Sequence, residues 1–143
     1  MILRKGRESD LENVLNIEVL AYKKPYWNQN MLLEVLANKT DKRLWIYEVD
    51  NDVIGFIIDM RHKDEISLLN IVINKRVQGM GHGLKMLKKY IKSLKGKYSI
   101  YLEVNKNNIR ALNMYTKLNF ERVSTRKSYY NDGGDAINME LVK

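Results

Sequence analysis

A glycine-rich turn in the middle of the chain is the first segment whose residue types and spacing suggest chemistry. It reads Arg-Val-Gln-Gly-Met-Gly-His-Gly over residues 76–83. Glycines allow a sharp bend and let a ligand approach the backbone closely. A helix is expected directly after the turn, and the free N–H groups and dipole of a helix start attract anions. The turn is a candidate phosphate or pyrophosphate site, although a plain turn that begins a helix would have the same composition.

Two familiar phosphate-binding patterns do not fit this turn. A P-loop closes on Gly-Lys followed by Ser or Thr, and the turn has no such ending. A dinucleotide fingerprint needs a third glycine and a later ribose-binding acid at fixed spacings, which are missing here. The turn alone therefore indicates an anion at most, without naming it.

Glu103 is the candidate base for proton transfer. It lies in a run expected to form a strand, in which Ile100, Leu102 and Val104 share one face. The Glu103 carboxylate then points to the other face with Tyr101. A carboxylate in the middle of an apolar strand needs a partner or a purpose. It could serve as a general base or form an ordinary ion pair.

Tyr115 is the candidate acid. It follows Asn108 by seven residues and Ala111 by four, so the three share one face of an expected helix. An unperturbed phenol has a pKa of about 10, is protonated at neutral pH and can donate its proton. From the residues alone, a tyrosine in the core is the preferred interpretation, and the role of acid is the alternative.

Three further tyrosines could line a binding groove. Tyr26 follows a helix-breaking proline, and Tyr129 and Tyr130 are adjacent at the end of an expected strand. Neighbouring strand residues point to opposite faces, so these two cannot both face the core. Tyrosine offers apolar area and a hydroxyl group, which suits a peptide-binding groove. A hydrophobic plug after the breaker is an equally good interpretation of Tyr26.

The elements expected around these residues alternate between strands and helices. They follow the order β, α, α, β, β, β, α, β, α, β, β, which predicts an α/β (α+β) domain with a mixed sheet flanked by helices. The expected strands cover residues 1–5, 43–49, 53–60, 66–73, 98–104, 120–130 and 135–142. The expected helices cover residues 9–22, from 27 or 28 through 36, from 84 to a cap at 96, and from a cap at 107 or 108 to about 118.

Local signals set the expected ends and faces of these elements. Ser9 and Glu12 have the spacing of a capping box at the start of the first helix. Asn107 or Asn108 can cap the last helix, and Gly96 is expected to cap the end of the third. The buried face of the third helix is expected to consist of Leu84, Leu87, Ile91 and Leu94.

Composition excludes several classes of protein. The 143 residues suit one domain spanning 1–143, and there is no cysteine for disulfides, thiolate nucleophiles or thiolate metal sites. His62 and His82 are too few and too scattered for a metal site. No apolar run is long enough for a membrane helix, and the first residues lack a signal core, so a cytoplasmic protein is expected.

The net charge of +8 has two interpretations. The lysines are densest in residues 84–97, where they are expected to form the solvated face of a helix. No nucleic-acid motif accompanies them, which argues against a nucleic-acid partner. The chain is expected to be a monomer or a weak dimer.

The motifs together resemble those of the GNAT acetyltransferases. Arg76-x-x-Gly79-x-Gly81 resembles the loop with which that family holds the pyrophosphate of acetyl-CoA. Leu102-Glu103-Val104, followed by Asn108, Ala111, Tyr115, Leu118 and Phe120, resembles its fifth strand and fourth helix. Residues 126–139 resemble the ending of protein N-terminal acetyltransferases, both the RimI type and the related archaeal enzymes. The RimI type acetylates the N-terminal alanine of a ribosomal protein.

This resemblance implies a GNAT fold, acetyl-CoA as cofactor and a role for each candidate residue. Glu103 would be the base and Tyr115 the acid. The acceptor would bind to Tyr26, Asn70, Tyr129 and Tyr130. The cofactor would bind to Ile71, Val72, Ile73, Arg76, Val77, Gln78, Gly79, Met80, Gly81, His82, Gly83, Asn108 and Tyr115.

The resemblance leaves three alternatives for the function, two of which differ in the group that accepts the acetyl group. The leading one is the N-terminal α-amino group of a protein, which could be a ribosomal protein. A small-molecule amine or a lysine side chain is the second. A basic RNA- or ribosome-binding domain without catalysis is the third. Three departures from the family pattern bear on structure. The loop between Ile73 and Arg76 is about two residues shorter than in typical relatives, which bears on the role of Arg76. Asn119 stands where relatives usually have glycine, and Gly134 replaces a residue that is often acidic.

Overall fold

The computed structural model describes residues 1–22 and 24–143, which form two compact units. The first unit contains Met1–Met60 and Asn70–Leu94, and the second contains Arg61–Leu69 and Lys95–Lys143. Strand β4 (Glu65–Ile73) contributes its first half to the second unit and its second half to the first.

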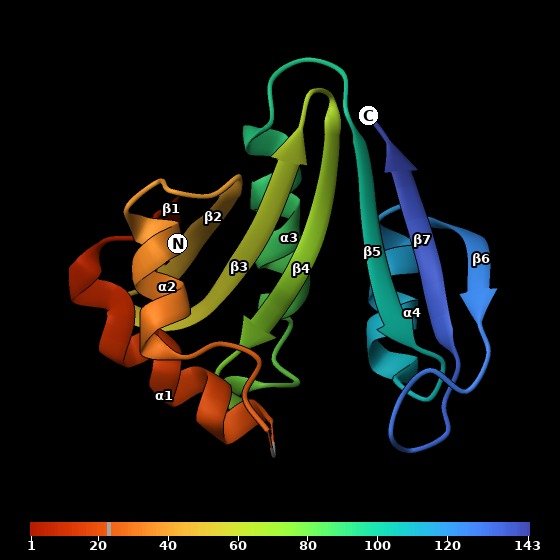
Figure 1. Cartoon of the computed structure of the whole chain (residues 1–143), viewed down its shortest axis with the longest axis horizontal. Helices are drawn as coiled ribbons and strands as arrows, with labels where there is room; N and C mark the ends of the chain where they lie inside the picture. The colour runs from red at the N-terminus through yellow and green to blue at the C-terminus, as the bar shows by residue number, and fades with distance from the viewer. Residues whose placement is uncertain (23) are drawn as a thin grey trace. The chain divides into compact units, whose positions relative to one another are not determined.

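The first unit is a sheet covered by helices on both faces (Figure 1). Its strands are β1 (Ile2–Lys5), β2 (Lys42–Val49) and β3 (Asp52–His62), with the end of β4. Helices α1 (Leu11–Ala21) and α2 (Gln29–Leu36) lie on one face, and α3 (His82–Ser93) lies on the other. Short 3₁₀ turns at Glu8–Asp10 and Lys75–Val77 precede α1 and α3.

The second unit pairs the remaining strands with one helix. It contains the start of β4, then β5 (Ser99–Asn105), α4 (Ile109–Lys117), β6 (Glu121–Arg126) and β7 (Ala136–Val142). The strand order is β1-β2-β3-β4-β5-β7-β6. β4 and β5 run parallel, and the other described pairs whose direction is known are antiparallel. The predicted element order and the predicted mixed, mostly antiparallel sheet are confirmed.

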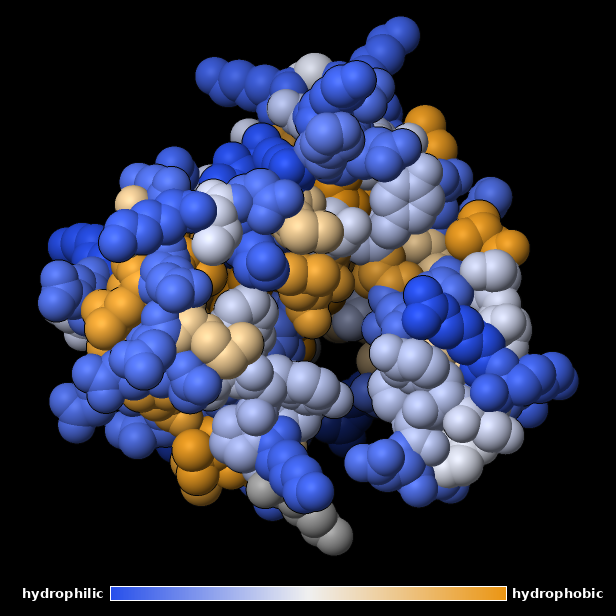
Figure 2. Space-filling model, viewed as in Figure 1, coloured by the Kyte–Doolittle hydropathy of each residue, from blue (hydrophilic) through white to orange (hydrophobic). Residues whose placement is uncertain are grey.

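Burial of apolar side chains holds α1 and α2 against the sheet. Val14 and Ile17 of α1 and Leu32 and Val35 of α2 pack in one cluster with residues of β2, β3 and β4. Fully burying a side chain of this size stabilises a fold by roughly 1.5–3 kcal/mol. Figure 2 shows hydrophilic side chains over much of the surface, with hydrophobic ones scattered among them.

Among the predicted helix caps, the one at Asn108 is confirmed, and the turns at Asp50–Asn51 and at Asn119 have the geometry that their residue types favour. Asp50 and Asn51 both have positive φ, 51° and 64°, as a tight hairpin turn between β2 and β3 requires. The side chain of Asn108 accepts from the Ala111 amide at the start of α4. Asn119 has a φ of 71°, so it adopts the left-handed geometry for which relatives use glycine.

The predicted capping box at Ser9 and Glu12 is wrong. A 3₁₀ turn comes first, and the Asp10 carboxylate accepts from the Arg7 amide at 2.7 Å. Arg4 of β1 reaches the same carboxylate at 2.8 Å and draws it into the interior. Burial opposes ionisation of Asp10, but the hydrogen bonds from Arg4 and Arg7 lower its pKa. The ion pair with β1 therefore displaced the local cap.

Two details of α3 also differ from the prediction. Leu87 and Leu94 are buried, but Leu84 and Ile91 are only half-buried, while Met86 and Tyr90 are fully buried. The buried stripe is rotated because the Tyr90 hydroxyl bonds to the buried Asp59 carboxylate. The helix ends at Ser93 with an extended C-cap at Leu94, so Gly96 does not cap it.

The last hairpin is shorter than expected. β6 ends at Arg126, and residues 127–135 form a loop in which Tyr130 donates from its amide to the Gly134 carbonyl at 3.1 Å. The Asp135 carboxylate accepts from the Ser128 amide, and Ser128 has a φ of 50°. These turn contacts replace the ladder of a strand, so Tyr129 and Tyr130 lie in a loop.

Candidate active site

The turn after β4 has the backbone geometry of an anion-binding loop. Gly79 and Gly81 have φ angles of 81° and 85°, a region that is costly for residues with a side chain. A Cβ added at Gly81 would meet no atom within 4 Å, so glycine is needed there for its conformation and not for space. The turn is fixed at its start, where Asn74 donates from its amide to the Ile54 carbonyl and accepts from the Arg76 amide.

The start of α3 presents unpaired amides directly after this turn. The first intrahelical bond runs from the Lys85 amide to the Gly81 carbonyl, so the amides before Lys85 have no partner within the helix. The first turn of α3 has no acidic residue. These amides and the helix dipole favour an anion at this end of the helix.

The predicted cofactor residues in this region differ in what they already bind. Arg76 pairs with Asp52, and both side chains are largely exposed. The Gln78 side chain donates to the Ile73 carbonyl at 3.0 Å. Val72 is buried, whereas Ile71 and Ile73 are half-buried. Arg76 can leave the Asp52 carboxylate and bind another anion at little cost, because an exposed ion pair contributes at most about 1 kcal/mol to stability.

His82, one of the predicted cofactor residues, lies at the start of α3. It is half-buried, its ring lies 6.3 Å from that of Tyr47, and its Nδ1 is buried with no hydrogen-bond partner among the described residues. The reason is that the first turn of α3 packs against the sheet, which draws the ring inward. Val77 and Gly83 are half-buried nearby, and Met80 is 65% exposed.

A buried polar cluster lies on the α1 side of β4. Glu18 of α1 is fully buried and accepts from the Trp27 amide and the Asn70 side chain. Asn70 in turn accepts from the Tyr22 hydroxyl. Burial raises the pKa of Glu18, against the opposing effect of the hydrogen bonds from Trp27, Asn70 and Tyr26. Tyr26 is 62% exposed, and its ring meets that of Tyr22 edge-on.

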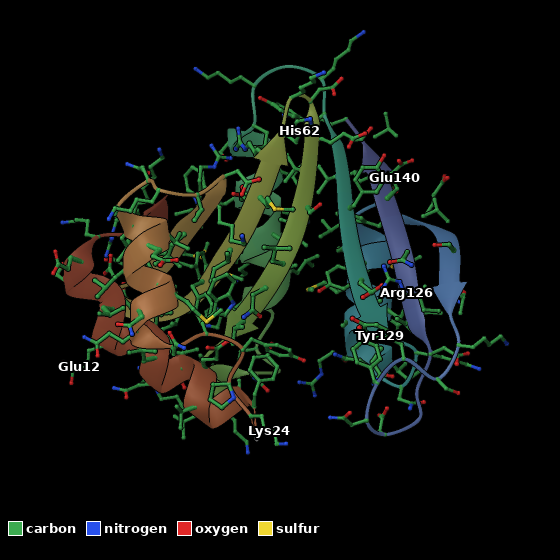
Figure 3. All side chains as sticks on the ribbon, in the orientation of Figure 1. Glu12, Lys24, His62, Arg126, Tyr129 and Glu140 are labelled. Atoms are coloured by element: carbon green, nitrogen blue, oxygen red, sulfur yellow. The ribbon has the colours of Figure 1, made fainter. Side chains whose placement is uncertain are left out.

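Glu103 of the second unit is half-buried. Ile100, Leu102 and Val104 are buried on the opposite face of β5, as the alternation predicted. The Glu103 carboxylate lies 3.3 Å from Nε of Arg126, whose side chain is 62% exposed. Arg126 also stacks over the ring of Tyr129 at 5.3 Å, and Figure 3 shows these two side chains beside each other. One exposed side chain therefore contacts both the predicted base and a predicted acceptor residue.

Tyr115 and Asn108 lie on α4. Tyr115 is 8% exposed and meets Phe120 edge-on at 5.8 Å, which fixes its ring. Asn108 is exposed, and its side-chain oxygen caps the helix, which leaves its amide nitrogen for a ligand.

The loop that carries Tyr129 and Tyr130 is tied to the end of β5. Asp132 accepts from the side chains of Asn105 and Asn107 and from the Gly134 amide. These bonds, led by that from Gly134, lower the pKa of Asp132. A Cβ at Gly134 would come closer than 3.0 Å to side-chain atoms of Asn105, Asp132 and Asn107. This crowding explains why glycine stands at a position that is often acidic in the family.

Comparison with known proteins identifies the family. The sequence profile of the Acetyltransferase (GNAT) family matches residues 11–120, which include the glycine turn, Glu103 and Tyr115. The chain belongs to the GNAT acetyltransferase family. It is an acetyl-CoA-dependent N-acetyltransferase, as the members of that family are.

Individual GNAT relatives match along nearly the whole chain. A [ribosomal protein bS18]-alanine N-acetyltransferase of Haemophilus influenzae is 36% identical, over 90% of this chain and 87% of its own. An N-alpha-acetyltransferase of Sulfurisphaera tokodaii is 27% identical, over 96% and 90%. The crystal structure of the ribosomal-protein-S18-alanine N-acetyltransferase from Escherichia coli matches with a TM-score of 0.86 and 27% identity, over 99% and 92%.

The residues of the GNAT loop fit the diphosphate of acetyl-CoA. Two glycines with positive φ and a helix start without acidic residues are suited to a group that carries two negative charges. Arg76 adds a cation whose present partner, Asp52, is exposed.

No helix among the described residues is long and apolar enough to span a membrane.

Sequence reasoning missed two residues that contact predicted GNAT site residues and a third that holds the loop carrying two of them. Glu18 binds Asn70, Arg126 binds Glu103, and Asp132 holds the loop of Tyr129 and Tyr130. Glu18 had one signal, because a carboxylate among buried positions of α1 needs hydrogen-bond donors. Arg126 and Asp132 had none, since their contacts depend on the strand register and on the path of the loop.

Proposed function

We propose that this enzyme acetylates the N-terminal α-amino group of a protein or peptide. The observation that carries the proposal is the match along nearly the whole chain to relatives named for this acceptor. The exposed Tyr26 and Tyr129 support it, because each offers apolar area and a hydroxyl to a peptide chain.

Several groups of residues would take part in the reaction. The turn at Gly79 and Gly81 and the start of α3 would hold the diphosphate. The end of β4, residues 71–73, would offer backbone groups to the pantetheine arm. Acetyl-CoA supplies an activated acyl carbon when it is bound. Glu103 and Tyr115 would accept and donate the protons.

Proton transfers would accompany the acetyl transfer. Glu103 would accept a proton from the acceptor ammonium group, directly or through water, which leaves a neutral amine to attack the carbonyl carbon. As the new C–N bond formed and the C–S bond broke, Tyr115 would give its proton to the departing sulfur. The nitrogen would lose its second proton, which restores the Tyr115 hydroxyl through water, and Glu103 would release its proton to solvent. The half-exposed Glu103 is accessible for this role, and the ring of Tyr115 is fixed by Phe120.

The energetics favour an α-amine over lysine. An α-amino group has a pKa of about 7.7–8.0 and a lysine side chain about 10.4, so deprotonating lysine near neutrality costs roughly 3.5 kcal/mol more. One carboxylate with an exposed cation beside it is a modest base, which is sufficient for an α-amine.

A peptide library with acetyl-CoA tests this proposal, with mass spectrometry as the readout. The library would include the N-terminus of a ribosomal protein that begins with alanine. Each peptide would be paired with one whose N-terminus is blocked and which carries an internal lysine. We expect transfer to free N-termini only. Transfer to blocked peptides, or to small amines alone, would overturn the proposal.

A further inference from the structure

Glu18 is a buried carboxylate for which the proposed reaction has no use. It is fully buried on α1, the helix whose Val14 and Ile17 are also buried in the apolar core. A buried carboxylate is costly unless donors satisfy it, and an apolar side chain would suit these neighbours better. The carboxylate at this position therefore serves the groups that donate to it.

Those groups come from two segments that the proposed function uses. One donor is the amide of Trp27, at 2.9 Å, in the segment between α1 and α2 that also carries Tyr26. A second donor is the side-chain nitrogen of Asn70, at 3.0 Å, directly before residues 71–73 of β4, and a third is the amide of Tyr26, in the same segment as Trp27. A single carboxylate thus joins the segment of an expected acceptor residue to the strand expected to bind the cofactor.

Asn70 extends the connection to a third group. Its side chain is 6% exposed, and its oxygen accepts from the Tyr22 hydroxyl at 3.1 Å while its nitrogen donates to Glu18. The Tyr22 ring lies edge-on to Tyr26 at 5.0 Å. Both ends of the Asn70 amide are occupied, so it supports Tyr26 through neighbours and has little surface for an acceptor of its own.

We propose that Glu18 and Asn70 are positioning residues that hold Tyr26 and its segment against β4 and so set the affinity for the acceptor. The proposal rests on the proposed function, and it changes the role expected of Asn70 from direct binding to support. Neither residue takes part in the proton transfers.

An exchange of the two side chains tests this proposal. In Glu18→Gln, one carboxylate oxygen becomes an NH2 group. This new donor then faces a donor that the carboxylate bound, either the Asn70 side-chain nitrogen or the Trp27 amide. In Asn70→Asp, two carboxylates face each other. In the double variant the complementarity returns, because the introduced amide accepts from Trp27 and donates to the introduced carboxylate, which also accepts from Tyr22. Steady-state kinetics would be measured twice, once with the concentration of an accepted peptide varied and once with the concentration of acetyl-CoA varied.

Each single variant should raise the KM for the peptide about tenfold, because each leaves a buried group without its partner. kcat and the KM for acetyl-CoA should stay within about twofold. The double variant should recover to within about threefold of the wild type. Glu12→Gln is the matched control, because Glu12 lies on the exposed side of the same helix (Figure 3) and should change nothing.

Four outcomes would count against the proposal. Single variants with an unchanged KM for the peptide would overturn it, as would a double variant without recovery. If the single variants do not fold, Tyr22→Phe removes only the hydroxyl bond to Asn70. It should raise the KM for the peptide a few-fold, and no change would be decisive against the proposal. A wild-type protein that acetylates no peptide would overturn the proposed function together with this one.

Discussion

Glu18 and Tyr22 in the first unit and Glu103 and Tyr115 in the second are the same two residue types in different surroundings. Glu18 is fully buried and accepts from Trp27 and Asn70. Glu103 has 27% of its side chain exposed and lies beside the exposed guanidinium of Arg126. The first carboxylate cannot exchange its partners without opening the fold, whereas the second can.

The difference in burial separates residues that hold the structure in place from residues that transfer protons. A base must lose and regain a proton, so its partner has to be displaced at low cost. An exposed ion pair contributes about 0–1 kcal/mol, while breaking up a buried set of polar contacts costs several kcal/mol. We therefore expect changes at Glu103 and Tyr115 to reduce the rate, and changes at Glu18 and Tyr22 to alter stability and acceptor affinity.

The largest expected effect is at Tyr115. Tyr115→Phe should lower kcat by two to three orders of magnitude, about 3–4 kcal/mol, because no other group would protonate the leaving sulfur. Acetyl-CoA binding, measured by calorimetry, should change little. Tyr22→Phe is the matched control and should leave kcat within about twofold. An equal loss of binding and turnover would assign Tyr115 a packing role against Phe120.

Glu103→Gln should have the next largest effect, and the effect should depend on pH. At pH 6.5 the acceptor is almost entirely an ammonium ion, so losing the base should lower kcat/KM about 100-fold. At pH 9 most of the amine is already neutral, and the loss should shrink to under about tenfold. Rates over this range with one peptide test it. A loss that does not change with pH would argue that Glu103 is an ordinary ion-pair partner.

The local elements of the fold were readable from the sequence, and the contacts between distant segments were not. Alternation in β5 predicted the face of Glu103, and the glycine turn predicted the backbone geometry at Gly79 and Gly81. The Ser9 capping box failed because Arg4 binds the Asp10 carboxylate from another element. Local patterns carry no information about such a partner.

The same limit applies to the candidate site. Glu18 and Asn70 are 52 positions apart, so nothing in either neighbourhood indicates that they share a hydrogen bond. Arg126 reaches Glu103 because β7 pairs with both β5 and β6, placing Glu103 and Ser124 on either side of Asn138. That register, together with the early end of β6, decides which cation meets the base.

The raised pKa of Tyr22 predicts that the fold loses stability at alkaline pH. Burial, with smaller contributions from Tyr26 and Glu18, raises the pKa of Tyr22 to about 12, against about 10 in an unfolded chain. Between these values the unfolded chain releases a proton that the folded chain keeps. The free energy of unfolding should therefore fall as pH rises from 10 to 12, by about 2 kcal/mol from this residue.

Urea unfolding at pH 9 and pH 11.5 isolates the contribution of Tyr22. The wild type should lose more stability between the two pH values than Tyr22→Phe does, because the variant has no proton to release at that position. Tyr26→Phe is the matched control, since Tyr26 is 62% exposed. Equal losses in the wild type and in Tyr22→Phe would mean that the buried cluster opens more easily than its contacts indicate.

Arg126 should give the smallest effect, and it tests whether Glu103 is held loosely. Its side chain is 62% exposed, so the pair with Glu103 contributes at most about 1 kcal/mol. Arg126→Gln should change kcat/KM by no more than about threefold and leave the melting temperature unaltered. Arg122→Gln, an exposed position on the same strand, is the control. A loss of thirtyfold or more would mean that the acceptor does not simply displace Arg126 and that Glu103 depends on its partner as Glu18 does. The contrast between the two carboxylates would then be one of exposure alone.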